Sequence, residues 1–274
     1  MNSKRSSQME MEGLTGLKSL VETYEEIAAG QMQKVRTAVL TAREFLQGLA
    51  EIFGEVKSNY KTSRIVKTGQ TVAVWISANA GLYGDIVGRS FDLFVDYVNT
   101  NQAEAVVVGR LGTKMMADRL PKTLYNYYDL EDDRVEVEDL ALMMRYLLQF
   151  RKIVVFYGQF KSLVNQVPAA TSVSGDDIQI PNPKSQIPKN LYLFEPKVGE
   201  VLEFFEGQML TTMFEQTVHE SQLAKFASRL MSLDGAVENI DKKVRQLNQA
   251  GLRLKHRTDG RKQLNRIAGM SLWS

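Results

Sequence analysis

The sequence predicts a mostly parallel α/β domain set between two long helices that pair as an antiparallel coiled coil. Near both ends, apolar or small residues recur at alternating steps of three and four, which is the heptad spacing of a coiled-coil seam. None of the six prolines lies before Pro121 or after Pro196, so neither end carries the residue that breaks helix interiors. Between the ends, short apolar runs alternate with helical patterns, which is typical of parallel strands joined by helices.

The N-terminal coiled-coil helix is expected over residues 13–60, after a polar, disordered leader over residues 1–12. Its seam contains Leu17, Val21, Tyr24, Ala28, Val35, Ala38, Ala42, Phe45, Leu49, Ile52 and Val56, with Gln31 as the one polar residue on the line. A lone helix cannot bury such a seam, so a partner helix is needed. An ordinary helical bundle is the alternative, but the middle of the chain supplies no further long helices to complete one.

The C-terminal coiled-coil helix is expected over residues 197–274. Its seam contains Val198, Leu202, Phe205, Met209, Met213, Val218, Leu223, Phe226, Leu230, Leu233, Val237, Ile240, Val244 and Leu247. The last part is strongly basic, with Lys242, Lys243, Arg245, Arg253, Lys255, His256, Arg257, Arg261, Lys262 and Arg266. Two interpretations stay open for these charges: a solvated helix face, and a surface that moves against acidic groups of a partner.

The α/β domain is expected over residues 61–196. Buried strands are predicted at Thr71–Ala78, Ala105–Val108 and Lys152–Tyr157, with an edge strand at Leu124–Tyr128. Helices are predicted from Ile86 to Val98, Gly109 to Arg119 and Val137 to Phe150. This alternation is Rossmann-like. Five prolines from Pro168 to Pro196 predict a long irregular connection between strands near Phe160–Val167 and Leu191–Phe194.

Composition excludes several classes of function. A net charge of +2 favours neither nucleic acid nor an acidic membrane surface as the main partner. The absence of cysteine excludes disulfides, thiol catalysis and thiolate metal sites, and it fits a reducing compartment. The longest apolar runs are far shorter than the ~20 residues that span a bilayer, and no signal peptide is visible.

The search for chemistry yields no predicted catalytic residue, cofactor site or metal site. Gly81 and Gly84 follow a strand but do not make a dinucleotide fingerprint, so a strand-to-helix turn is favoured. His219 and His256 have no second ligand at the following turn. The acidic cluster Asp132, Asp133, Glu136, Glu138 and Asp139 is explained by the dipole at a helix N-terminus. A catalytic carboxylate pair is invisible to this reasoning and stays open.

Five segments carry a family resemblance: Ser77–Val87 (SANAGLYGDIV), Val106–Gly109 with Thr113-Lys114, Phe156–Pro168, Leu191–Pro196 and Arg229–Asn239. In this order they resemble the gamma subunit of F-type ATP synthases, and together they span most of the chain. Glu22–Met32 departs from that family's basic run, and Ala224-Lys225-Phe226 replaces its Ser-Glu-His. Arg253 and Lys255 keep the charge of a basic family motif. The departures fall where family members contact the beta subunits.

The resemblance implies a non-catalytic central-stalk rotor shaft, without a cofactor, in a rotary ATP synthase or ATPase. Such a shaft couples hydrogen-ion transport through the membrane c-ring to conformational cycling of the beta catalytic sites. The implied partners are the alpha and beta subunits of the hexameric ring, the epsilon subunit and the c-ring, with no nucleic acid. The implied location is peripheral, on the cytoplasmic face of the cell inner membrane, with membrane association only through the complex.

The resemblance also implies contact residues. Tyr192 and Glu195 are expected at the foot near the membrane ring, and Arg253 and Lys255 on the upper shaft, facing beta-subunit loops. Two alternatives remain. One is a shaft paralogue of a non-synthesising rotary ATPase, and the other is a stand-alone α/β nucleotide-binding module with helical arms and a ligand at Gly81–Gly84.

Overall fold

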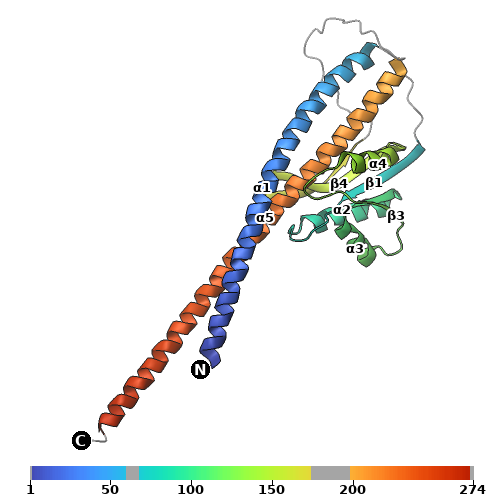
Figure 1. Cartoon of the computed structure of the whole chain (residues 1–274). Coiled ribbons are helices and arrows are strands. Elements are labelled where there is room, and N and C mark those ends of the chain that lie inside the picture. The colour runs from blue at the N-terminus through green and yellow to red at the C-terminus, as the bar shows by residue number, and fades with distance from the viewer. Residues whose placement is uncertain (1, 60–67, 174–197, 272–274) are drawn as a thin grey trace. The chain divides into compact units, whose positions relative to one another are not determined.

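The computed structural model describes residues 2–59, 68–173 and 198–271, which form two compact units. Unit 1 consists of residues 1–27 and 230–274, and unit 2 of residues 28–229. Helix α1 (Asn2–Asn59) and helix α5 (Val198–Ser271) each contribute to both units (Figure 1). Among the described residues, no helix has both the length and the hydropathy that a bilayer-spanning segment needs.

Unit 1 is an antiparallel pair formed by the first part of α1 and the last part of α5, as predicted (Figure 1). The Lys18 ammonium lies 2.7 Å from the Asp241 carboxylate of the facing helix. Leu233 and Ile240 of α5 are buried, and Val237 is half-buried between them, which confirms the predicted α5 seam in this unit.

The seam of α1 in unit 1 follows the prediction only at Val21, which is half-buried. Leu17 and Tyr24 are 48% and 46% exposed. The half-buried line contains Met11, Leu14, Lys18 and Val21. The α1 sequence carries two adjacent apolar lines, and the one that faces α5 includes Lys18, because its side chain reaches Asp241.

Helix α1 begins at Asn2, so the expectation of a disordered leader is wrong for residues 2–12. These residues include Lys, Arg, Gln, Met and Glu, which are good helix formers, and no glycine precedes Gly13. The segment therefore continues the helix that follows it.

Unit 2 contains a five-stranded sheet with the order β3-β2-β1-β4-β5. The strands are β1 (Thr68–Ile76), β2 (Glu104–Val108), β3 (Tyr125–Tyr128), β4 (Phe150–Ser162) and β5 (Asn165–Ser172). Strand β1 pairs in parallel with both β2 and β4, and β2 pairs in parallel with β3. Only β5 is antiparallel to its neighbour. The predicted mostly parallel sheet and the edge position of β3 are confirmed.

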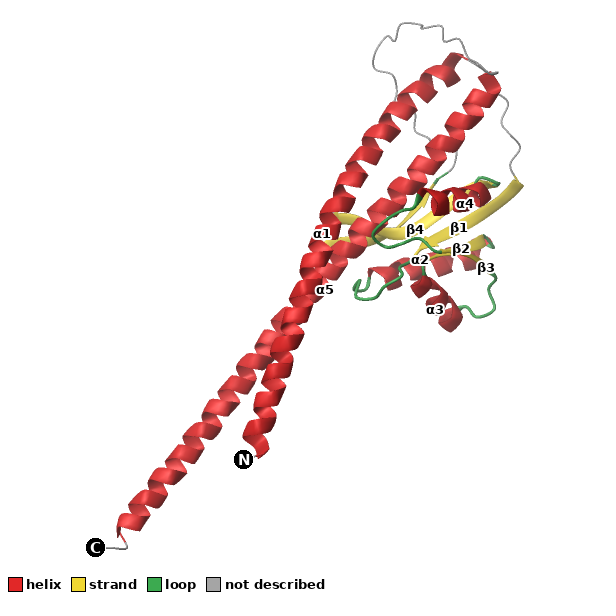
Figure 2. Ribbon diagram, viewed as in Figure 1, coloured by secondary structure: helices red, strands yellow, loops and turns green. Residues whose placement is uncertain are grey.

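Helices cover both faces of this sheet (Figure 2). One face carries α2 (Ile86–Asn101) and α3 (Arg110–Arg119), which pack on Trp75 and Phe156. The other carries α4 (Val137–Leu147) and α5, which pack on Val74 and Val155. Because both faces are covered, β1, β2 and β4 each contain a continuous apolar run, which made them visible in the sequence.

The two long helices contribute to the core of unit 2. Met209, Val218, Leu223 and Phe226 of the predicted α5 seam are buried. Val218 packs in the cluster with Val74 and Val155, and Leu223 and Phe226 pack in the cluster with Trp75 and Phe156. On α1, Val35 is buried as predicted, whereas Phe45 on the same predicted line is 52% exposed. Long helices in this unit therefore bury their apolar faces against a sheet as well as against a helix.

Three predicted boundaries are wrong: the end of the helix that begins at Val137, the strand at Phe160–Val167, and the start of the irregular connection at Pro168. Helix α4 ends at Leu147, because Phe150 already begins β4. The segment Phe160–Val167 is not one strand: β4 turns at Leu163–Val164 into β5. Pro168 lies inside β5, opposite Gly158, and is tolerated because β5 is an edge strand. The predicted strand at Leu191–Phe194 lies outside the described residues.

Candidate functional site

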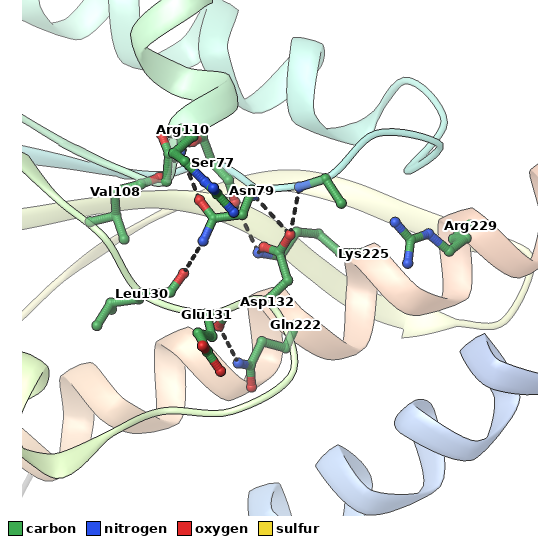
Figure 3. Close-up of polar contacts among 12 residues, drawn as sticks. Ser77, Asn79, Val108, Arg110, Leu130, Glu131, Asp132, Gln222, Lys225 and Arg229 are labelled. Atoms are coloured by element: carbon green, nitrogen blue, oxygen red, sulfur yellow. Dashed lines mark hydrogen bonds and ion pairs between the residues drawn. The ribbon is translucent and has the colours of Figure 1, made fainter. Parts of the chain in front are cut away.

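The carboxyl edge of the parallel strands is where an open α/β sheet usually binds its ligand. Here two loops leave that edge: the β1–α2 loop (77–85) and the β3–α4 loop (129–136). Figure 3 shows that α5 passes beside both loops and directs several polar side chains at them. We call this contact the carboxyl-edge junction; its α5 residues are Gln222, Lys225, Ser228 and Arg229.

Lys225 is the centre of the junction. Its side chain is only 6% exposed, and its ammonium donates to Asp132 Oδ1 at 2.8 Å and to the Ser77 carbonyl at 2.9 Å. Asp132 is itself 11% exposed and lies in the β3–α4 loop. One cation on α5 therefore binds both loops at once, in a buried place where each bond is strong.

Asp132 is held in its charged form. Its Oδ2 atom accepts hydrogen bonds from the backbone N–H groups of Asn79 and Ala80, at 2.8 and 2.9 Å. Burial alone would raise the pKa of this carboxyl group, but the ammonium of Lys225 and the two N–H donors outweigh burial and lower the pKa. The carboxylate thus links the two loops to each other as well as to α5.

Asn79 extends the junction to helix α3. Its Oδ1 atom accepts from the backbone N–H of Arg110 at 2.7 Å, which satisfies one of the unpaired donors at the α3 N-terminus. Its amide nitrogen donates to the Leu130 carbonyl at 2.9 Å and to Asp129 at 2.7 Å. The β1–α2 loop, the β3–α4 loop and α3 are therefore bound into one network.

Residues on neighbouring turns of α5 complete the contact. Gln222 donates to the Glu131 carbonyl at 3.3 Å, and Ser228 donates to the Tyr83 carbonyl at 2.7 Å. Arg229 donates to the Gly81 carbonyl at 2.7 Å, and its guanidinium carbon lies 4.0 Å from the centre of the Tyr83 ring. Each of these positions is three or four residues from Lys225, so they lie with it on one face of the helix.

His219 lies one turn before the junction. Its Nδ1 atom is 3.0 Å from Gln222 Oε1, and its Nε2 atom is 3.6 Å from the Glu215 carboxylate. Burial lowers the pKa of His219, but the contacts with Glu215 and Gln222 outweigh burial and raise it. The imidazole is thus coupled through Gln222 to the β3–α4 loop.

Side chains of α5 lie against the carboxyl edge, where an open α/β sheet usually binds its ligand. A Cβ atom at Gly158 would lie 2.7 Å from Ile86 Cγ1 and 3.5 Å from Ala224 Cβ, so α5 packs directly on β4 there. The Gly81 carbonyl is bound by Arg229, and the first N–H of α3 is bound by Asn79. The junction is built to hold a helix, and this occupancy disfavours a nucleotide site at Gly81–Gly84.

The predicted contact residues do not lie in the junction. Arg253 and Lys255 are both exposed on α5, within unit 1. Tyr192 and Glu195 lie outside the described residues.

Sequence reasoning missed the junction. It placed Lys225 among residues that touch another subunit, whereas Lys225 is buried against loops of its own chain. It explained Asp132 by a helix dipole, although Asp132 lies in the loop before α4 and pairs with Lys225. The available signal was a single lysine in the segment 221–228, whose other residues are small, apolar or uncharged. Such a lysine needs a buried acidic partner.

Comparison with known proteins gives a consistent result. The sequence profile of the ATP synthase family matches residues 3–254. The ATP synthase gamma chain of Mycoplasmoides gallisepticum is 23% identical over 264 residues, which cover 88% of this chain and 89% of the relative. The ATP synthase gamma chain of Desulfitobacterium hafniense is 22% identical over 267 residues, covering 91% and 93%.

Solved structures share the fold. A chain of the Euglena gracilis mitochondrial ATP synthase (OSCP/F1/c-ring, rotational state 3) matches with a TM-score of 0.65 and 13% identity, covering 98% of this chain and 94% of that chain. A chain of the Tetrahymena thermophila mitochondrial ATP synthase central stalk and c-ring matches with a TM-score of 0.59 and 16% identity, covering 79% and 99%.

Proposed function

This chain belongs to the ATP synthase gamma-subunit family, and on that premise we propose that it is the central-stalk rotor shaft of an F-type ATP synthase. The observation that carries the proposal is the family match over residues 3–254, which includes the paired terminal helices as well as the α/β domain between them. The partners are the alpha and beta subunits of the catalytic ring, the epsilon subunit and the c-ring. The shaft couples ion-driven rotation of the c-ring to the conformations of the beta catalytic sites.

The charge of the α5 end supports this role. Between Lys242 and Arg266 the sequence has nine Lys or Arg residues and one acidic residue, Asp259. Successive residues are about 100° apart around a helix, so Arg253 and Lys255 point to nearly opposite sides. Positive charge therefore surrounds the helix. A shaft that turns inside a ring of similar subunits needs such a surface, because no single side can be reserved for one partner.

A rotation experiment tests the proposal directly. The chain has no cysteine, so Lys122→Cys provides a single labelling site on the exposed α3–β3 connection. A bead attached there, on a complex whose alpha and beta subunits are immobilised, should turn in one direction when ATP is added. A bead that stays still in a complex that hydrolyses ATP would contradict the rotor function.

The contact residues have their own test. We propose that Arg253 and Lys255 face acidic loops of the beta subunits. The double variant Arg253→Glu/Lys255→Glu should lower the ATPase rate of the reconstituted complex several-fold, because attraction becomes repulsion. Lys152→Glu, an exposed charge reversal at the start of β4, is the matched control and should leave the rate unchanged. Equal rates for the double variant and the wild type would rule out this placement.

We also propose that Tyr192 and Glu195 lie at the foot of the shaft, near the c-ring. Glu195→Lys should reduce ATP-driven ion pumping while hydrolysis by the detached catalytic sector stays normal. An equal effect on both activities would place this residue elsewhere.

As a subunit of this complex, the chain is peripheral to the membrane. We propose that it lies on the cytoplasmic face of the cell inner membrane. Inverted membrane vesicles should then expose it to added protease, and right-side-out vesicles should protect it. The opposite pattern would overturn this location.

The acidic surface of α1 favours a second candidate: the same shaft in a rotary ATPase that does not synthesise ATP. Glu22 and Glu26 are exposed on α1, and Glu25 is half-buried, where family members carry a basic run. ATP synthesis by vesicles under an imposed ion gradient separates the two. Synthesis would exclude the second candidate, and pumping without synthesis would support it.

A further inference from the structure

We propose that the carboxyl-edge junction transmits torque between the sheet domain and α5. Lys225 is the positioning residue that prevents the sheet domain from rotating around α5. The inference rests on the rotor function proposed above and says which atoms of the rotor carry the load. It concerns contacts inside unit 2 alone.

The hydrogen bonds of Lys225 have a fixed direction, which the apolar contacts of α5 lack. The α5 residues Leu210, Phe214 and Val218 pack on the sheet through apolar contacts, which have no preferred orientation. A helix held only in this way can roll or slide at little cost. Charge-assisted hydrogen bonds, in contrast, weaken steeply when their geometry changes. The two bonds of Lys225 therefore resist the motion that apolar packing permits.

The polar contacts are also spread along α5. Gln222, Lys225 and Ser228 lie on successive turns of one face of α5, and they bind two loops that leave different strands. Asn79 ties those loops to α3. A twisting force on the sheet domain therefore reaches α5 at several levels along its axis, through groups that are fixed to β1, β3 and α3.

The junction places an ion pair, Lys225 with Asp132, in a buried position. Lys225 and Asp132 have side-chain exposures of 6% and 11%. Apolar side chains of similar size usually stabilise such a place as well as an ion pair does. The best-attested use of a buried polar pair is to fix the register of two elements. Register between shaft and sheet domain is what a rotor must keep under load.

The test removes both charges together. In Lys225→Met/Asp132→Asn no unpaired charge is left buried, and the Asn oxygen still accepts from Asn79 and Ala80. The variant is assembled into the complete complex in vesicles, and both ATP hydrolysis and ATP-driven ion pumping are measured. We expect hydrolysis to stay near the wild-type rate and pumping to fall several-fold. The control is Lys122→Met, an exposed site in the same unit, which should change neither.

The alternatives are distinguishable. A merely structural role lowers hydrolysis and pumping together, along with assembly of the complex, and this result would overturn the proposal. Unchanged pumping would also overturn it. Failure of the proposed rotor function would instead appear in the wild-type chain, as a complex without coupled pumping.

A covalent rescue provides the second measurement. The Gly158 and Ala224 Cβ positions are 3.5 Å apart, a spacing that suits a disulfide between β4 and α5. Ile86→Ala removes the atom that would meet the Gly158 substituent. In the neutral double variant, Ile86→Ala/Gly158→Cys/Ala224→Cys should restore pumping when oxidised and lose it again on reduction. A crosslink that forms without restoring pumping would show that the junction does not carry torque.

Discussion

Substitution of Gly112 by alanine tests how tightly α3 supports the carboxyl edge of the sheet. A Cβ atom at Gly112 would lie 2.5 Å from Val107 Cγ1 and 2.6 Å from Ser77 Oγ. Favourable contacts between carbon atoms need about 3.5–4.0 Å, so these neighbours must move by about 1 Å. Neither moves easily: Val107 is fully buried, and Ser77 Oγ donates to the Val108 carbonyl at 2.5 Å.

Two effects oppose each other in the Gly112→Ala variant. Alanine is favoured over glycine inside a helix by about 1 kcal/mol. Overpacking a tight core costs about 1–3 kcal/mol, and disturbing the Ser77 hydrogen bond adds about 1 kcal/mol. The net loss of unfolding free energy is therefore about 1–3 kcal/mol, which corresponds to a melting temperature lower by roughly 2–12 °C.

Gly88→Ala is the matched control, because Gly88 lies in α2 and a Cβ atom there would meet nothing within 4 Å. This variant should gain up to about 1 kcal/mol and melt slightly above the wild type. Both melting curves are measured on the full chain by circular dichroism. If Gly112→Ala stabilised the chain as much as Gly88→Ala, the close packing of α3 on Ser77 would be refuted.

Four further predictions concern the same edge of the sheet. Lys225→Met alone leaves the Asp132 charge without its partner and should lower the unfolding free energy by about 3–5 kcal/mol, whereas adding Asp132→Asn should recover part of that loss in urea unfolding curves. Because the pKa of Asp132 is lowered in the folded chain, its contribution to the folding stability is present above the unfolded value of 3.8 and is lost as pH falls through the folded pKa. Asp132→Asn should therefore make the unfolding free energy depend less on pH in the acid range. The pKa of His219 is raised, so its contribution to the folding stability is present below the unfolded value of 6.5 and is lost as pH rises through the folded pKa. His219→Gln should therefore destabilise the chain more at mildly acidic than at alkaline pH, measured in urea unfolding curves. Equal effects at both pH values would contradict the raised pKa. Gly109 has φ +96°, and its Cβ would lie 2.9 Å from the Ala78 backbone, so Gly109→Ala should cost about 1–3 kcal/mol or more, measured by the shift of the urea midpoint.

The sequence predicted the sheet because its strands are buried on both faces. The central strands β1, β2 and β4 each contain a short continuous apolar run, because that part of the strand is covered on both faces. The hairpin between β4 and β5 left no comparable mark. Its turn at Leu163–Val164 has neither glycine nor proline, which usually mark a turn. Pro168 argues against a strand, and it is tolerated in β5 because β5 lies at the edge of the sheet.

The seam of α1 shows a different limit. Leu14 and Val21 lie on one apolar line of the helix, and Leu17 and Tyr24 on the next. Periodicity establishes that both lines exist but not which of them faces α5. The choice depends on a long-range ion pair, Lys18 with Asp241, that no local pattern reveals.

The junction was beyond sequence reasoning for the same reason. Lys225 and Asp132 are 93 residues apart, and each alone has an ordinary local explanation. Only the parallel order of β1, β2 and β3 brings their following loops to one edge, and only the position of α5 puts a cation there. In an α/β fold this edge usually stays open for a ligand. Here α5 of the same chain occupies this edge. The position that binds ligands in other α/β folds therefore joins α5 to the sheet domain.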